Sequence, residues 1–182
     1  MKLLIASDIH GSSAACQRLL ERFERLQADQ LLLLGDLLYH GPRNDLPTNY
    51  DPKGVIALLN PLKEKIIAVR GNCDGEVDQM VLEFPITADY NVLLMDGYRI
   101  FASHGHVYSP QHLPSLGKGD VFLYGHTHLP QAVKENDLYL LNPGSITLPK
   151  GGNPPTYAVL ENDVFTIYTF EDEVFRQIPL KD

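Results

Sequence analysis

The sequence predicts an α/β fold in which two β-sheets pack into a sandwich flanked by helices. Two observations support this prediction. In the first part of the chain, strand-like and helix-like segments alternate, which is typical of a parallel sheet with right-handed crossovers. After Pro85, strand-like segments follow one another, so they must extend the first sheet or form a second one. The chain has 182 residues without a linker or an internal repeat, which favours one domain over residues 1–182.

The alternating part begins with three short apolar runs, which predict strands at residues 2–7, 30–34 and 65–69. Apolar residues at three- and four-residue spacing predict a helix over 11–28, capped by Ser12 or Ser13. A second helix is expected after Asp51, an N-cap residue, with proline at its first position, and Pro61 is expected to limit it. A long polar loop covers 39–50, and a short helix is expected at 76–82.

Strand signals dominate the rest of the chain. The segments Asp96-Gly97 and Glu161-Asn162-Asp163 have the composition of hairpin turns. The expected strands cover residues 92–95, 99–103, 121–124, 138–141, 156–160 and 165–170.

Composition excludes several classes of protein. The formal net charge is −8 and there is no stripe of Lys and Arg, so binding to a nucleic-acid polymer is not expected. No apolar run approaches the ~20 residues of a membrane span. The two cysteines, Cys16 and Cys73, do not suggest a disulfide framework. We therefore expect a soluble cytoplasmic protein.

Asp, Asn and His side chains follow five of the predicted strands, at the point where each strand ends. In open α/β sheets this edge is where ligands bind, so these side chains are expected to converge from distant parts of the chain. The five segments are Asp8-Ile9-His10, Gly35-Asp36, Gly71-Asn72-Cys73-Asp74, His104-Gly105-His106 and Gly125-His126-Thr127-His128.

A metal centre is the chemistry that this cluster favours. Four imidazoles, two carboxylates and an amide oxygen are too many ligands for one tetrahedral ion and suit two ions of higher coordination, such as Mn, Fe, Zn, Ni or Co. Two cations about 3.5–4 Å apart repel each other, so they need an anionic group that bridges them. They also lower the pKa of a water molecule bound between them, which is then a hydroxide at working pH. They also neutralise the charge that develops on a phosphoryl group, so a phosphate ester is the expected substrate.

The motifs Asp-x-His, Gly-Asp, Gly-Asn-x-Asp, His-Gly-His and Gly-His-Thr-His, in this order, resemble those of the calcineurin-like metallophosphoesterase superfamily. Within it, the whole chain is similar to a group of small bacterial phosphodiesterases. The resemblance implies a four-layer α/β/β/α fold and a dinuclear site, often loaded with Mn²⁺, in which a metal-bridging hydroxide attacks a phosphate diester. It also implies that the first ion is bound by Asp8, His10 and His128, the second by Asn72, His104 and His126, and that Asp36 bridges them.

Cys73 departs from the superfamily pattern, because most members have His after the Asn. A thiol with an ordinary pKa of about 8.5 is a poorer proton donor than an imidazolium, so we expect activated aryl esters to be hydrolysed faster than alkyl esters. Asn72 and Cys73 are the candidate catalytic residues. Cys73, Arg43 and His106 are the candidate substrate contacts, together with His40 in the same loop as Arg43.

Two alternative functions stay open at this stage. The same site could hydrolyse phosphate monoesters, because the sequence does not show whether the pocket accepts a second ester group. A trafficking subunit of the retromer complex also resembles this fold, which makes a catalytically weak scaffold the other alternative. The expected partner is a small phosphodiester substrate, and a homo-oligomer is compatible with the sequence.

Overall fold

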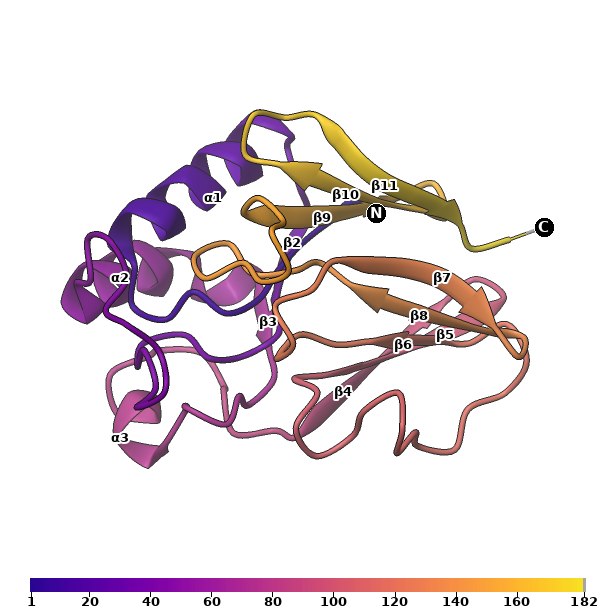
Figure 1. The fold of residues 1–182 in the computed structure, drawn as a ribbon, viewed down its shortest axis with the longest axis horizontal. Coiled ribbons are helices and arrows are strands. Elements are labelled where there is room, and N and C mark those ends of the chain that lie inside the picture. Colours follow the sequence, from indigo (N-terminus) through magenta and orange to yellow (C-terminus); the bar gives the residue numbers. More distant parts are fainter. Residues whose placement is uncertain (182) are drawn as a thin grey trace.

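The computed structural model, which describes residues 1–181, contains two mixed β-sheets that pack face to face (Figure 1). The six-stranded sheet has the order β11-β10-β9-β1-β2-β3, and the five-stranded sheet has the order β4-β5-β6-β8-β7. The first sheet comprises β1 (Leu3–Ala6), β2 (Gln30–Leu33), β3 (Ile66–Ala68), β9 (Thr156–Glu161), β10 (Val164–Thr169) and β11 (Val174–Pro179). The second comprises β4 (Tyr90–Met95), β5 (Tyr98–Ser103), β6 (Val121–Leu123), β7 (Gln131–Glu135) and β8 (Leu138–Asn142).

The parallel strands β1, β2 and β3 are buried on both faces, which explains their continuous apolar sequence. Because side chains alternate along a strand, Leu4 and Ala6 pack against the helices. Leu3 and Ile5 face the other sheet, where they join the core between the two sheets.

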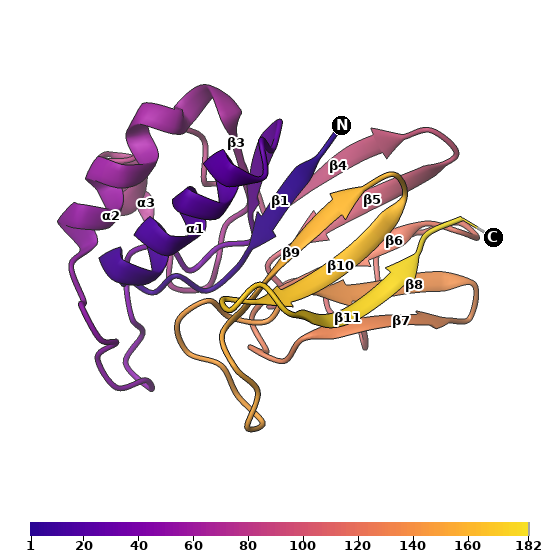
Figure 2. The ribbon, with the colours of Figure 1, turned by 90° about the horizontal axis from the view of Figure 1, so that it is seen from above.

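The helical elements gather on one side of the molecule, where α1 and α2 pack against the six-stranded sheet (Figure 2). They are α1 (Ser13–Arg25), α2 (Pro52–Leu59), α3 (Glu76–Gln79) and the 3₁₀ segment Asn60–Lys65. As predicted, Ser12 caps α1 by accepting a hydrogen bond from the backbone of Ala15, and Asp51 caps α2. As predicted, α2 ends before Pro61, at Leu59. The chain then continues as the 3₁₀ segment, where Pro61 lies in the first turn and lacks only a hydrogen-bond donor that would be unpaired.

The outer face of the five-stranded sheet is covered by the segment between β5 and β6. Buried aromatic residues on that face, such as Phe101 and Phe122, pack against Tyr108, Leu113 and Leu116 from this segment. Among residues 1–181 no helix takes this place, so the outer layer here is a packed loop. The predicted fold class, two sheets flanked by a few helices, is confirmed.

Two strands, β7 and β11, were not predicted from the sequence. Both lie at the edge of their sheet and alternate polar and apolar residues only weakly, as in Gln131, Lys134 and Arg176. An edge strand keeps one side in solvent, so its sequence lacks the apolar run that marks a central strand. Within the described residues, no helix combines the length and the hydrophobicity that crossing a bilayer requires.

Candidate metal centre

The loops that follow β1, β2, β3, β5 and β6 meet at one edge of the sandwich, and backbone hydrogen bonds join them. The backbone N–H of His10 donates to the carbonyl of Asp36 at 2.9 Å, and that of Gly125 donates to the carbonyl of His104 at 2.7 Å. A contact between the two sheets is made by Asp8, whose Oδ2 accepts a hydrogen bond from the backbone N–H of His126 at 3.1 Å. The predicted convergence of these strand ends is therefore present.

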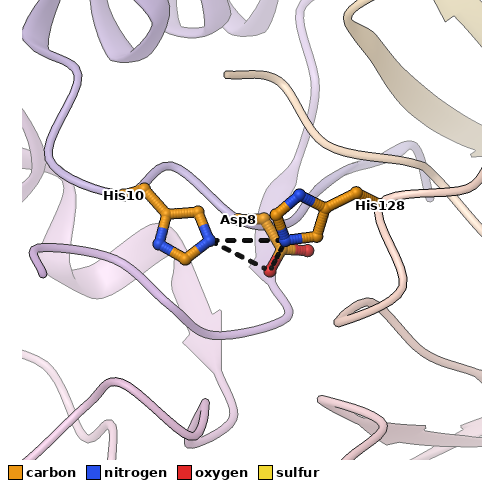
Figure 3. Close-up of side chains that lie close together, drawn as sticks. All are labelled: Asp8, His10 and His128. Carbon is orange, nitrogen blue, oxygen red and sulfur yellow. Dashed lines mark hydrogen bonds and ion pairs between the residues drawn. The ribbon is translucent and has the colours of Figure 1, made fainter. Parts of the chain in front are cut away.

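Asp8, His10 and His128 form the first cluster of ligand atoms (Figure 3). The Oδ1 atom of Asp8 lies 3.1 Å from Nε2 of His128 and 3.6 Å from Nε2 of His10. The two Nε2 atoms are 3.4 Å apart. All three side chains are buried, although they come from the loops after β1 and β6.

Asp36 lies between this cluster and a second group of polar side chains. Its Oδ2 atom is 3.7 Å from Nε2 of His10 and 3.5 Å from Nε2 of His104. His104 Nε2 is in turn 3.0 Å from Oδ1 of Asn72. The other Asp36 oxygen, Oδ1, accepts a hydrogen bond from the backbone N–H of Cys73 at 2.8 Å, so Oδ2 is the atom that faces both groups.

The donor atoms of this site fit divalent cations. Asp8 Oδ2 is held by Ser7 Oγ at 2.6 Å and by the backbone of His126, whereas Asp8 Oδ1 is buried and accepts no hydrogen bond from any described residue. A buried carboxylate oxygen without a donor is costly unless a cation compensates it. Imidazole nitrogens at 3.1–3.6 Å from this oxygen complete a set of ligands that suits transition metals.

Three imidazoles are held by backbone carbonyls through their Nδ1 atoms. His10 Nδ1 donates to the carbonyl of Tyr39 at 2.9 Å. His104 Nδ1 donates to the carbonyl of Leu34 at 2.6 Å, and His128 Nδ1 donates to that of Leu148 at 2.5 Å. These contacts fix the tautomer and turn each Nε2 toward the centre, which is the arrangement that metal-binding histidines require.

Several candidate ligands have left-handed backbone conformations, which non-glycine residues adopt rarely. The φ angles are 60° for Asp8, 48° for His10, 56° for Asp36, 63° for His126 and 60° for His128. Such strain, of order 1–3 kcal/mol per residue, persists where surrounding structure enforces it and is concentrated at functional sites. The tight turns aim side chains from one strand end toward the common centre.

Close backbone packing in this region also requires glycine. A Cβ atom on Gly125 would clash with Ser7 Oγ, which holds Asp8, and a Cβ atom on Gly71 would clash with Asp36 Oδ1. These glycines therefore allow two strand ends to approach the carboxylates.

Burial and neighbouring charges shift the pKa values of Asp8, His104 and Cys73. Burial alone would raise the pKa of Asp8, but the neighbouring imidazoles of His10 and His128 hold that pKa well below its ordinary value. Burial likewise opposes protonation of His104, but Asp36 and Asp8 outweigh it and raise the pKa of His104 to about 9. Burial, reinforced by the charge of Asp36, raises the pKa of Cys73 to about 12, so this thiol stays protonated.

The remaining predicted residues differ in their distance from the cluster. A pocket of about 410 Å³ opens onto it and is lined by Arg43, Asn72, Cys73 and His126, among others. The His126 ring centre lies 5.1 Å from that of His104, near the second group. His106 is exposed, with its ring centre 5.3 Å from that of His104, and it does not line this pocket.

His40 packs edge-on against two tyrosines rather than facing the cluster. Its ring centre lies 4.8 Å from that of Tyr39 and 5.2 Å from that of Tyr50. Like His106, it is absent from the lining of the pocket at the metal centre, whereas Arg43 from the same loop belongs to that lining.

Sequence reasoning missed the structural role of Asp74. Its buried carboxylate accepts hydrogen bonds from the backbone N–H groups of Asp36 at 2.8 Å, Leu37 at 2.9 Å and Gly71 at 2.7 Å. It thereby ties the loop after β2 to the loop after β3. Its place in the Gly-Asn-x-Asp motif was the available signal.

A second set of residues, from the Asn142-Pro143-Gly144-Ser145 segment at the end of β8, supports the loop between His126 and His128. The Nδ2 atom of Asn142 donates to the carbonyl of Gly125 at 2.9 Å and to Oγ1 of Thr127 at 3.1 Å. Ser145 donates to the carbonyl of Asp8 at 3.0 Å. Lys150, which no motif marks, also lines the pocket.

Comparison with known proteins agrees with this geometry. Residues 1–164 match the family model of the calcineurin-like phosphoesterase superfamily domain. The chain is 51% identical over 173 residues to phosphodiesterase YfcE of Escherichia coli (strain K12), an alignment that covers 95% of this chain and 94% of that protein. A solved structure of YfcE, a phosphoesterase from E. coli, superposes with a TM-score of 0.98 at 49% identity over the full length of both chains.

With more distant proteins the chain shares only the fold. Wild-type Vps29 from Entamoeba histolytica, solved in complex with Zn²⁺, has a TM-score of 0.62 at 22% identity, with 100% of each chain covered. The closer relatives confirm the expected enzyme class, a phosphoric ester hydrolase. The chain belongs to the calcineurin-like phosphoesterase superfamily.

Proposed function

We propose that this protein is a metal-dependent phosphodiesterase that acts on a small phosphate diester at a dinuclear centre. The observation that carries the proposal is the position of Asp36 Oδ2, 3.7 Å from His10 Nε2 and 3.5 Å from His104 Nε2. One carboxylate oxygen is shared between two sets of ligand atoms, as a bridging ligand requires. The 51% identity to a phosphodiesterase supports the diester as the substrate class.

The residues would divide between two ions. Asp8, His10 and His128 would hold the first ion, because their ligand atoms already lie within 4.8 Å of one another. Asn72, His104 and His126 would hold the second, supported by the 3.0 Å contact between His104 and Asn72. The two divalent ions, Mn²⁺ in our proposal, would supply an activated water and neutralise charge on the phosphoryl group.

The protein itself would orient the substrate and control protons. Arg43 and Lys150 line the pocket and supply positive charge for a phosphoryl oxygen. Cys73 keeps its proton because burial and Asp36 raise its pKa to about 12, so it acts neither as a thiolate nucleophile nor as an efficient acid at neutral pH. Without an efficient acid to protonate the leaving group, an ester that releases a stable aryl oxide should react faster than one that releases a basic alkoxide.

The test begins with protein that a chelator has stripped of metal. Hydrolysis of bis(p-nitrophenyl) phosphate is measured while Mn²⁺, Zn²⁺, Ni²⁺ and Mg²⁺ are added singly. The same assay is applied to Asp36→Asn, which removes the bridging charge, and to Asp137→Asn, a matched control at a surface carboxylate. Activity that returns with a transition metal in the wild type and the control, but not in Asp36→Asn, supports the proposal.

Two other results would replace it. A clear preference for p-nitrophenyl phosphate over the bis-aryl ester would make the protein a monoesterase. No hydrolysis with any metal, in protein that remains folded, would indicate a scaffold that keeps its metal ligands.

We also propose a cytoplasmic location, supported by the absence of a disulfide between the two free cysteines, Cys16 and Cys73.

A further inference from the structure

An apolar groove of about 510 Å³ lies beside the metal centre, between α2, α3 and the loop that follows β2. In both ribbon views α2 and α3 lie at the same end of the molecule (Figure 1). The loop contributes Tyr39 and Tyr50 to the groove, α2 contributes Ile56, and α3 and the residues after it contribute Val77 and Val81.

Large apolar side chains are open to solvent in this groove. The exposed fraction is 41% for Tyr39, 73% for Val77 and 43% for Val81. The charged residue in the lining is Asp78, whose Oδ2 accepts a hydrogen bond from the backbone N–H of Gly75 at 2.7 Å. The groove therefore offers apolar and aromatic surface, which is typical of a site for an apolar group of a small ligand.

The groove adjoins the pocket of the metal centre at Cys73. This residue lines both the groove and the pocket that opens onto the ligand cluster. Its Sγ atom lies within 4.8 Å of ligand atoms of His10 and Asp36. A phosphoryl group held at the cluster therefore has the groove within reach of its ester groups.

The two sides of Cys73 differ in polarity. The pocket on the metal side carries the cationic side chains of Arg43 and Lys150, whereas the groove side carries valines and tyrosines. A diester whose two ester groups were both small and polar would leave the groove empty. An aryl ester group would cover the exposed faces of Tyr39 and Val77 and remove apolar surface from water.

We infer that the groove binds one of the two ester groups of the substrate, and that this group is aromatic or otherwise apolar. The inference rests on the proposed phosphodiesterase function, which places the phosphoryl group at the ligand cluster. It narrows the substrate class to diesters that carry an aryl or similarly flat apolar substituent. Val77, Val81 and Tyr39 are then specificity-determining residues.

The experiment compares two ligands of equal charge, diphenyl phosphate and diethyl phosphate, in binding titrations of the Mn²⁺-loaded protein followed by isothermal titration calorimetry. The variant Val77→Asn/Val81→Asn makes the groove polar without adding charge. The control Leu94→Asn changes a side chain of β4 that is 79% exposed and lies outside the groove. Each titration is completed while the ligand is still intact, which a parallel assay for released phenol or ethanol checks, so the result reports binding and does not depend on which ester group leaves.

We expect the wild type and Leu94→Asn to bind diphenyl phosphate roughly tenfold more tightly than diethyl phosphate, the lower end of the discrimination that apolar pockets reach. The groove variant should lose most of this preference while its affinity for diethyl phosphate stays unchanged. A preference that survives in the groove variant, or that is absent in the wild type, would overturn the inference.

The inference and the proposed function fail separately. Intact hydrolysis of bis(p-nitrophenyl) phosphate, with equal affinity for the two ligands, would refute the apolar subsite and leave the phosphodiesterase in place. A groove-dependent preference for diphenyl phosphate without any hydrolysis would refute the enzyme function and leave the binding site. Unchanged affinity for diethyl phosphate in the variant also shows that the substituted protein is folded.

Discussion

Replacing Asp74 with alanine should destabilise the protein and disorganise the metal centre. Asp74 is 8% exposed and accepts three backbone N–H donors, from Asp36, Leu37 and Gly71. Alanine would leave these donors without a partner between the loops after β2 and β3. Because Asp36 is both a donor to Asp74 and the proposed bridging ligand, stability and metal binding should fall together.

The magnitude follows from the number of donors. Each buried group left unpaired costs about 1–3 kcal/mol. Burial raises the pKa of Asp74 in spite of its three hydrogen bonds, so the carboxylate charge offsets part of their contribution. We therefore take the lower end for each donor and expect a loss of about 3 kcal/mol in the free energy of unfolding. For a chain of this length that corresponds to a fall of roughly 6–12 °C in Tm.

Thermal and urea unfolding of metal-free protein measure this effect, with Asp78→Ala as the matched control. Asp78 also accepts a backbone hydrogen bond, from Gly75, but at an exposed position. Its loss should cost less than about 1 kcal/mol. If Asp74→Ala and Asp78→Ala lowered Tm equally, the role assigned to Asp74 would be refuted.

Three further predictions concern protons and substrate. In metal-free protein the pKa of His104 is raised from 6.5 to about 9, so protonation of His104 stabilises the folded state. This stabilisation is complete below pH 6.5 and is lost as pH rises through 9. Urea midpoints that do not fall over this range would contradict the prediction. Because the Cys73 thiol keeps its proton, aryl diesters should be hydrolysed faster than alkyl diesters, and Cys73→Ala should change either rate by less than about tenfold. Steady-state kinetics that show similar rates for the two ester classes would argue against this. Arg43→Ala and Lys150→Ala should each raise KM for a diester severalfold with little change in kcat, whereas the surface variant Lys118→Ala should leave both parameters as they are.

The central strands and the positions of the candidate ligands could be predicted from the sequence for the same physical reason. A strand buried on both faces must be apolar, so Leu31, Leu32 and Leu33 mark β2 clearly. A charged residue soon after such a strand, as Asp36 is, stands out in the sequence. The edge strand β7 could not be found in this way, because solvent on one side removes the need for an apolar run.

Other features depend on contacts between distant parts of the chain. The carbonyl of Leu148 that holds His128, and the three donors that converge on Asp74, are properties of loop packing that no local pattern encodes. Lys150 lines the pocket because the loop after β8 folds back over the site. The left-handed conformation of Asp8 likewise arises from its surroundings, since its residue type alone does not require it.

The measurement that tests the central claim most directly is the number of Mn²⁺ ions bound per chain, determined by equilibrium dialysis and elemental analysis. The wild type should bind about two ions per chain, and Asp36→Asn should lose at least one of them together with hydrolysis of the bis-aryl ester. A single bound ion in active wild-type protein, or full activity in Asp36→Asn, would contradict a centre in which Asp36 bridges two cations.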